Sequence, residues 1–345
     1  MARIFLGAAT LAAGGGIAQV ARLSAQMLRE AGHEVTVAAY LDHEAQPGDV
    51  AAGGSKLRFL AAAHRHAFSA DLCLYDGAGI ARAHPRWLKR PYAVWLHGAE
   101  VWNALTPAAH RAIRRAAGAL VVSHSTLSRF EALHGSLDNA HVCPLGTGTD
   151  APSPFALCRN ESPTVLIVGR VDAAEGYKGH DALIAAWPAV VAAVPDARLV
   201  IAGGGTGLPA LRGIAAASPV ANAIDIPGFV DEPTLADLWR EASVFAMPSR
   251  GEGFGLVYIE AMRHGLPVIA SIHDAGREVN VDGTTGFNVD LDQPGQLAAR
   301  LVTLLSDAEL RWRMSAAGQE RWHGHYRLSC LRSRFLPLID QLLRP

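Results

Sequence analysis

Residues 249–267 read SRGEGFGLVYIEAMRHGLP, and this stretch predicts a strand, a glycine-rich loop and a helix in succession. An apolar run over 242–247 leads into it, and from about Phe254 apolar residues recur at the three- and four-residue spacing of a helix. Gly265 and Pro267 then end the helix, because glycine is favoured just past a helix end and proline cannot continue one.

The loop of this stretch carries the groups that could bind a ligand. Gly251, Gly253 and Gly255 let the backbone turn tightly and approach a ligand closely. The helix that follows offers free N–H groups and the positive end of its dipole to phosphate oxygens. Glu252 lies in the loop and Glu260 about two helical turns later, where it can accept hydrogen bonds from ribose hydroxyls. The arrangement suits a phosphorylated, hydroxyl-rich ligand; the alternative is an ordinary turn with solvated acids.

The E-G-F-G run at 252–255, followed by Glu260, resembles the E-x7-E motif of retaining glycosyltransferases with the GT-B fold, glycosyltransferase family 4 in particular. The resemblance covers nearly the whole chain and is strongest over 164–287. It implies an α/β protein of two Rossmann-like domains whose parallel sheets face a central cleft. The domains would be an N-terminal acceptor-side domain over 1–150, a nucleotide-sugar-binding domain over 151–325, and a helix over 326–345 that crosses back to the first domain.

Length and composition agree with two cytoplasmic domains. A chain of 345 residues, half of them hydrophobic, can fill two cores of about 150–180 residues each. A net charge of −1 gives no overall sign of nucleic-acid binding. No run of eighteen apolar residues occurs, so a cytoplasmic location is expected, with contact at the inner face of the membrane left open. The scattered cysteines fit free thiols: Cys73, Cys143, Cys158 and Cys330.

Cations and an aromatic residue in the second half complete the predicted donor site. Arg170 follows the strand predicted over 164–169, and Lys178 opens the next helix, so both can offset the charge of a leaving diphosphate. Phe229 and Val230 follow another strand, where the family places its nucleotide base; Phe229 would stack on the base or, alternatively, pack in the core. The resemblance thus assigns donor binding to Arg170, Lys178, Phe229, Val230, Gly253, Phe254, Gly255, Leu256 and Glu260.

The N-terminal residues predict a strand over 4–9, a glycine-rich turn and a helix over 17–30, the start of a Rossmann-like sheet. A dinucleotide site with Asp42 as ribose acceptor is one interpretation, but Gln19 stands where the fingerprint has its third small residue and the turn is too long. The resemblance favours a mobile loop whose Gly15 and Gly16 reach the donor diphosphate.

His97 follows the strand predicted over 92–96. The carboxyl ends of parallel strands form the crevice in which open α/β sheets bind ligands. The resemblance makes His97 a catalytic residue beside the transferred sugar; the alternative is a packed or surface histidine.

Residues 56–115 hold ten Lys and Arg against three Asp and Glu, a local balance of +7. Such a face could meet anionic lipid or a diphosphate-lipid acceptor, and a merely solvated surface is the alternative.

Metal binding is not expected. Asp290-Leu291-Asp292 is formally the D-x-D clamp of another glycosyltransferase fold, but Asp292 is a natural cap for the helix predicted near 294. His273-Asp274 replaces the family's usual Gly-Gly, which puts ligand contacts of that loop in doubt.

Taken together, these features predict a retaining, metal-independent glycosyltransferase without a bound cofactor. It would move a sugar from a UDP- or GDP-sugar to a hydroxyl acceptor in polysaccharide or lipid-linked glycan synthesis, with Glu252 and His97 as the catalytic residues. Two other enzyme classes stay open: a sugar-nucleotide epimerase of the same fold and, on the glycine turn alone, an NAD-binding oxidoreductase. The sequence does not identify the donor base, the sugar or the acceptor.

Overall fold

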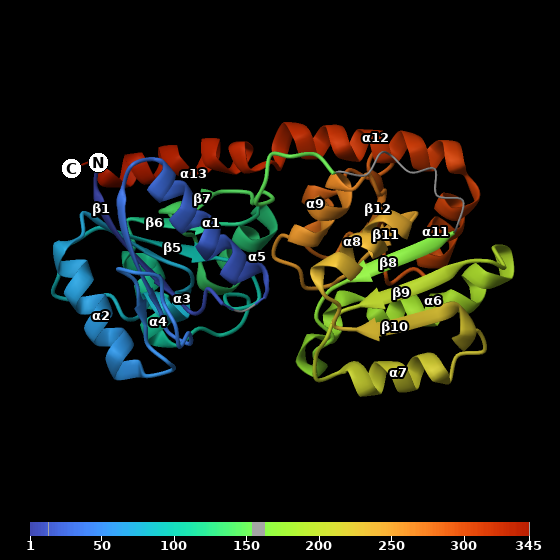
Figure 1. Ribbon diagram of the computed structural model, residues 1–345, viewed down its shortest axis with the longest axis horizontal. Coiled ribbons are helices and arrows are strands. Elements are labelled where there is room, and N and C mark those ends of the chain that lie inside the picture. The colour runs from blue at the N-terminus through green and yellow to red at the C-terminus, as the bar shows by residue number, and fades with distance from the viewer. Residues whose placement is uncertain (13, 154–162, 345) are drawn as a thin grey trace. The chain divides into compact units, whose positions relative to one another are not determined.

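A computed structural model describes residues 1–12, 14–153 and 163–344 and contains two parallel β-sheets (Figure 1). The chain divides into two compact units, Met1–Gly148 together with Leu328–Pro345, and Thr149–Arg327. The predicted α/β class with two Rossmann-like sheets is confirmed. Cys158 lies outside the described residues, and within them no helix is both long and apolar enough to cross a membrane.

The first unit is built on a seven-stranded sheet in the order β3-β2-β1-β4-β5-β6-β7. Its central strands are continuously apolar, as expected for parallel strands covered on both faces. Every pairing is parallel, so all carboxyl ends lie at one edge. The strands are β1 (Arg3–Ala8), β2 (Glu34–Ala39), β3 (Val50–Ala51), β4 (Leu72–Tyr75), β5 (Tyr92–Leu96), β6 (Gly118–Val121) and β7 (Ala140–Val142).

Helices cover both faces of this sheet. On one face Phe5, Phe59 and Val94 share a core with residues of α2, α3 and α4. Trp95 points to the opposite face, because successive strand side chains alternate, and stacks on Phe335 of α13 at 5.8 Å between ring centroids. The helices are α1 (Gly16–Glu30), α2 (Lys56–Ser69), α3 (Ala78–Ala81), α4 (Pro107–Arg115), α5 (His124–His134) and α13 (Leu328–Leu343).

The second unit has a six-stranded parallel sheet in the order β10-β9-β8-β11-β12-β13, and Figure 1 shows β8 between β9 and β11. Its strands are β8 (Thr164–Val168), β9 (Arg198–Ala202), β10 (Ile224–Gly228), β11 (Val244–Ala246), β12 (Val268–Ser271) and β13 (Gly286–Val289). Its helices are α6 (His180–Ala193), α7 (Leu208–Ala216), α8 (Glu232–Glu241), α9 (Leu256–Arg263), α10 (Gly276–Val279), α11 (Gln296–Ser306) and α12 (Ala308–His325), with short 3₁₀ turns η1 (Ala173–Lys178) and η2 (Ala221–Ala223).

Two local predictions in this unit are wrong. Helix α9 begins at Leu256 rather than near Phe254, because Gly255 has a φ of +84° that an α-helix cannot contain. Asp292 does not cap α11, whose N-cap is Gly295; its carboxylate instead accepts a hydrogen bond from Arg250 at 2.6 Å.

Replacing Phe335 by Ala should destabilise the first unit by about 3–5 kcal/mol, because it removes a fully buried ring that α13 packs on Trp95. Urea denaturation monitored by circular dichroism would measure the free energy of unfolding. Asp340→Ala, at an exposed position of the same helix, is the matched control. Equal stability of the Phe335 variant and the control would contradict the packing described here.

Candidate active site

The strand order of the second unit indicates where a ligand binds. Along the sheet, β9 and β10 lie to one side of β8, and β11, β12 and β13 lie to the other. The order therefore reverses between β8 and β11. In open parallel sheets ligands bind at the carboxyl ends of the strands that flank such a reversal. Arg170 follows β8, and the loop with Glu252 follows β11, so both lie at this point of the sheet.

An ion pair joins the segments that follow these two strands. The Nζ of Lys178 donates a hydrogen bond to Oε1 of Glu252 at 2.5 Å, and both side chains are largely buried, at 13% and 15% exposure. The stem of Lys178 crosses Gly169, where a side chain would lie 3.5 Å from its Cδ. Lys178 is the last residue of η1, so α6, the helix that it is predicted to open, begins two residues later at His180. Two of the predicted site residues are thus in direct contact.

The loop over 249–255 is held in shape by its own side chains. The Oγ of Ser249 accepts from the backbone N–H of Gly251 at 3.1 Å, and the hydroxyl of Tyr258 donates to the carbonyl of Met247 at 2.7 Å. A Cβ on Gly255 would lie 2.4 Å from the Tyr258 ring. Only glycine fits there, because the position also has a positive φ. The loop leads into the first turn of α9, where the backbone N–H groups have no carbonyl group one helical turn earlier to bind.

Asp274 is a residue of the site that the sequence reasoning missed. It follows β12 and is buried, and its carboxylate accepts from the backbone N–H of Glu252 at 2.9 Å and of Gly276 at 2.8 Å. Burial raises the pKa of Asp274 to about 6. The replacement of Gly-Gly by His273-Asp274 puts ligand contacts of this loop in doubt, and in the structure Asp274 contacts the backbone of Glu252. Its place after the strand next to β11 was the signal available in the sequence.

Arg170 and Phe229 occupy more open positions along the same edge. The guanidinium of Arg170 lies 3.8 Å from Asp172, and its side chain is 61% exposed. Phe229 follows β10, two strands from β8 and so about 10 Å away at ordinary strand spacing. Its 83% exposure excludes the interpretation as a core residue. Val230 follows it, outside the strand.

Glu260 lies in the second turn of α9, and Arg263 is one turn further on. Burial raises the pKa of Glu260 to about 7, and the charge of Arg263 offsets part of that rise. A ligand hydroxyl that donates a hydrogen bond to this carboxyl would stabilise its charged form and so lower its pKa.

In the first unit the order reverses between β1 and β4, and a second polar cluster lies at the carboxyl ends there. The carboxylate of Asp76, after β4, accepts from the backbone N–H of Ala9, after β1, at 2.6 Å. His97 follows β5, and its Nε2 donates to the carbonyl of Asp76 at 2.9 Å. Burial lowers the pKa of His97 and raises that of Asp76 to about 7. His97 is therefore a neutral imidazole with its tautomer set by a backbone carbonyl.

Gly15 and Gly16 lie at the start of α1, with Gly15 as its N-cap at a φ of +132°. The preceding residues are tied to Asp42, whose carboxylate accepts from the Thr10 hydroxyl at 2.5 Å and the Leu11 N–H at 2.8 Å. The Asp42 carboxylate, after β2, thus binds the loop after β1, which argues against a role as ribose acceptor in a dinucleotide site.

The D-x-D pair gathers with a histidine that the sequence reasoning had not linked to it. Ligand atoms of His273, Asp290 and Asp292 lie within 4.8 Å of one another. However, Nε2 of His273 accepts from the backbone N–H of Leu291 at 3.1 Å, and Asp292 is paired with Arg250. These contacts occupy the lone pair and the carboxylate that a cation would need.

Replacing Glu260 by Gln should change stability in a pH-dependent way. The raised pKa means that the folded state holds a proton between about pH 4.5 and 7 that the unfolded state has lost, so stability falls as pH rises through this window. Gln cannot ionise. Relative to the unaltered protein, the variant should therefore gain about 2–3 kcal/mol on going from pH 5 to pH 8.

Urea denaturation of both proteins at the two pH values would measure this difference. Asp76 and Asp274 titrate in the same direction in both proteins and cancel in the comparison. A variant whose stability difference is the same at pH 5 and pH 8 would show that Glu260 has an ordinary pKa.

Comparison with known proteins identifies the family of this chain. The sequence model of Glycosyl transferases group 1 matches residues 162–307. A GDP-mannose-dependent alpha-(1-6)-phosphatidylinositol monomannoside mannosyltransferase of Mycobacterium tuberculosis is 33% identical over 263 residues, 70% of this chain and 68% of the relative. A phosphatidyl-myo-inositol mannosyltransferase of Mycolicibacterium smegmatis is 31% identical over 338 residues, 90% and 86% of the two chains.

Solved structures agree on the fold. Sucrose-phosphate synthase from Thermosynechococcus elongatus superposes with a TM-score of 0.82 at 20% identity and covers 99% of both chains. Anabaena HepE in complex with UDP and glucose gives 0.80 at 15% identity, covering 99% of this chain and 100% of HepE. This chain therefore belongs to the Glycosyl transferases group 1 family and is a GT-B glycosyltransferase that uses a sugar nucleotide.

Proposed function

We propose that the enzyme transfers its sugar with retention of anomeric configuration and without a metal ion, and that GDP-mannose is the donor. The Lys178–Glu252 pair beside the loop before α9 carries the proposal, because it sets a phosphate-binding cation against a sugar-orienting carboxylate. GDP-mannose is favoured by the relatives' names at 31–33% identity. A phosphatidylinositol-type glycolipid is the acceptor class that these names suggest.

The donor would be held along the carboxyl edge of the second sheet. Arg170, Lys178 and the backbone N–H groups from Gly253 to Leu256 would bind the diphosphate. Glu260 would accept from the ribose hydroxyls. The exposed ring of Phe229 would stack on the base beside Val230, and the spacing of about 10 Å from β8 suits the separation of base and diphosphate.

Diphosphate binding would change the partner of Lys178. In the structure Lys178 and Glu252 neutralise each other. A diphosphate offers Lys178 a doubly charged partner, which leaves the Glu252 carboxylate to orient sugar hydroxyls and to steady a positively charged anomeric centre. Asp274 keeps the Glu252 backbone in place during this exchange. The neutral His97 imidazole would serve as a second sugar contact, held by Asp76.

The proposed step breaks the bond between the anomeric carbon and the phosphate oxygen while the acceptor hydroxyl attacks from the same face. The acceptor proton passes to an oxygen of the leaving diphosphate, whose growing charge Arg170 and Lys178 stabilise. Double displacement through two carboxylates would need a second acid about 5 Å away on the opposite face of the sugar. Asp274 cannot supply it, because its oxygens hold two backbone N–H groups.

Replacing Glu252 by Gln should lower kcat at least about 100-fold, because it removes a charge that acts in the transition state. Arg170→Gln should lower kcat/KM for the donor by about 10-fold or more, as expected for the loss of a charged hydrogen bond to the diphosphate and to the charge that grows on it. Transfer from GDP-mannose to phosphatidylinositol measures both, with Glu232→Gln, at an exposed acid of α8, as the control.

Two further measurements test the identity of the donor and the retention of anomeric configuration. A thermal-shift panel of GDP-mannose, UDP-glucose and ADP-glucose identifies the donor, and NMR of the product reports its anomeric configuration. Inversion at the anomeric carbon, or activity lost with EDTA and restored by a divalent ion, would overturn the proposed chemistry. A UDP-sugar isomerised without acceptor would favour the epimerase.

Membrane contact is proposed for α2. Its exposed side chains include Leu57, Leu60 and Phe68 together with Lys56, Arg58 and Arg65, and the helix contains no acidic residue. Apolar and basic side chains on one helix suit the boundary of an anionic membrane.

Charge removal at both Arg58 and Arg65 should therefore weaken binding to phosphatidylglycerol vesicles about 30-fold, because each cation near the surface contributes about 1 kcal/mol. Vesicle sedimentation at low and high salt measures the effect. Binding that is equal for the R58Q/R65Q variant and the unaltered protein, or absent at both salt concentrations, would remove α2 from the interface.

A further inference from the structure

A cavity lies in the first unit, and none of the residues that line it is assigned to the donor site or to catalysis. It has a volume of about 460 Å³, within the range of small-molecule sites. Its walls are the end of α3, the segment over 82–91, the start of β5 and one side of α4. Tyr92, which lines the cavity, begins β5, whereas His97 follows its end, about 16 Å away along the strand.

The lining is strongly and one-sidedly charged. Six cationic residues contribute to it and no acidic residue does. Within the described part of the chain none of the six forms an ion pair with a carboxylate. Five are arginines, whose planar guanidinium matches the oxygens of a phosphate. They are Arg82, Arg86, Lys89, Arg90, Arg111 and Arg115.

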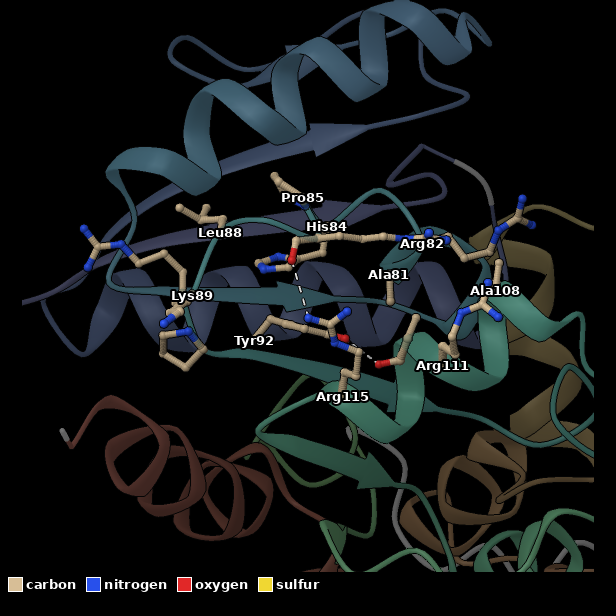
Figure 2. A pocket seen from close by; sticks show the side chains of 14 residues that line it. Ala81, Arg82, His84, Pro85, Leu88, Lys89, Tyr92, Ala108, Arg111 and Arg115 are labelled. Atoms are coloured by element: carbon tan, nitrogen blue, oxygen red, sulfur yellow. Dashed lines mark hydrogen bonds between the residues drawn. The ribbon is translucent and has the colours of Figure 1, made fainter.

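Figure 2 shows how these side chains are arranged. Arg115 reaches from α4 towards His84, while Arg82 and Arg111 lie at one end of the hollow and Lys89 at the other. The Nη2 of Arg115 donates to the carbonyl of Arg86 at 3.4 Å, which leaves most of its donors available. The cations therefore come from two separate segments and surround one space.

The wall between them is neutral and well packed. The rings of His84 and Tyr92 stack at 4.3 Å, and the Tyr92 hydroxyl donates to the carbonyl of Ala112 at 2.6 Å. Burial lowers the pKa of His84 to about 4, and the charge of Arg115 acts in the same direction. The positive charge of the cavity thus comes from Arg and Lys side chains alone.

We propose that this cavity binds a ligand through its phosphate groups. A single carboxylate would neutralise one cation, whereas a diphosphate or a phosphorylated headgroup brings several negative charges into one small volume. The ligand is either a soluble phosphate compound or the headgroup of an anionic lipid. Trp87 lies between lining residues and is 67% exposed, as expected for a side chain at a membrane boundary, so both sources belong in the test.

The lysines of this chain make a site-specific experiment available. The sequence contains three: Lys56 on α2, Lys89 at the cavity and Lys178 at the candidate donor site. The intact protein is treated with an amine-reactive ester, and mass spectrometry gives the modification rate of each lysine. Probes are inorganic pyrophosphate, phosphatidylglycerol vesicles and phosphatidylcholine vesicles. Pyrophosphate at ten times its Kd should slow Lys89 about tenfold by mass action. Protection of Lys178 separately reports occupation of the donor site.

Arg111→Gln is the test variant, since Arg111 is exposed and its side chain makes no hydrogen bond within the described residues. It should weaken protection of Lys89 by about tenfold or more. Arg313→Gln, the same change at an exposed position of α12 in the second unit, should leave the protection of Lys89 unchanged with every probe. Protection by pyrophosphate assigns a soluble ligand, and protection by phosphatidylglycerol vesicles alone assigns a lipid headgroup.

Three outcomes would overturn the proposal: no protection of Lys89 by any probe, equal protection by both kinds of vesicle, or protection that survives Arg111→Gln. The readout needs no turnover, so it is independent of the test of sugar transfer.

Discussion

The ion pair between Lys178 and Glu252 is the contact on which the candidate donor site depends. It connects the segment after β8 with the loop after β11, and Asp274, after β12, holds the Glu252 backbone from the other side. Segments that follow three adjacent strands thus converge on one residue, Glu252. Burying an ion pair adds little stability, because desolvation offsets the attraction. The pair holds the loop after β11 against the segment after β8, and in the proposed mechanism a diphosphate replaces the carboxylate as the partner of Lys178.

Parallel pairing explains why polar groups gather where they do. Both sheets are apolar through their central strands, and the carboxyl ends of all strands of a sheet lie along the same side. Backbone groups beyond these ends have no partner in the sheet, so polar groups can gather there. In each sheet the reversal of strand order opens that place to side chains. The second unit fills it with Lys178 and Glu252; the first fills it with Asp76 and His97, joined through a backbone carbonyl.

The two charged regions of the chain differ in how their charge is balanced. At the candidate donor site the Lys178 ammonium lies 2.5 Å from the Glu252 carboxylate, so the charges of these two groups cancel locally. In the cavity beside α4 six cations have no carboxylate among their lining neighbours. A region of one sign gains more from an anion than a neutralised pair does, because the anion displaces no internal partner. The two proposals differ accordingly: at the candidate donor site an anion would replace an internal carboxylate as the partner of Lys178, whereas in the cavity it would meet cations that have no carboxylate partner.

Local residue order determined the strand before Ser249 with the loop and helix after it, the position of Arg170 after a strand, and the presence of a helix at the end of the chain. Periodicity and glycine or proline signals act over a few residues, which is why these features could be predicted. Other features depended on which strands lie side by side and which surfaces are covered. Three of these features join residues far apart in sequence: the contact of Asp274 with the Glu252 backbone, the contact of Asp42 with the loop after β1, and the cavity lined by cations. The fourth, the exposure of Phe229, depends on which surfaces the fold covers. Only tertiary packing sets those distances, since a sequence pattern carries the period of an element but not the identity of its neighbour.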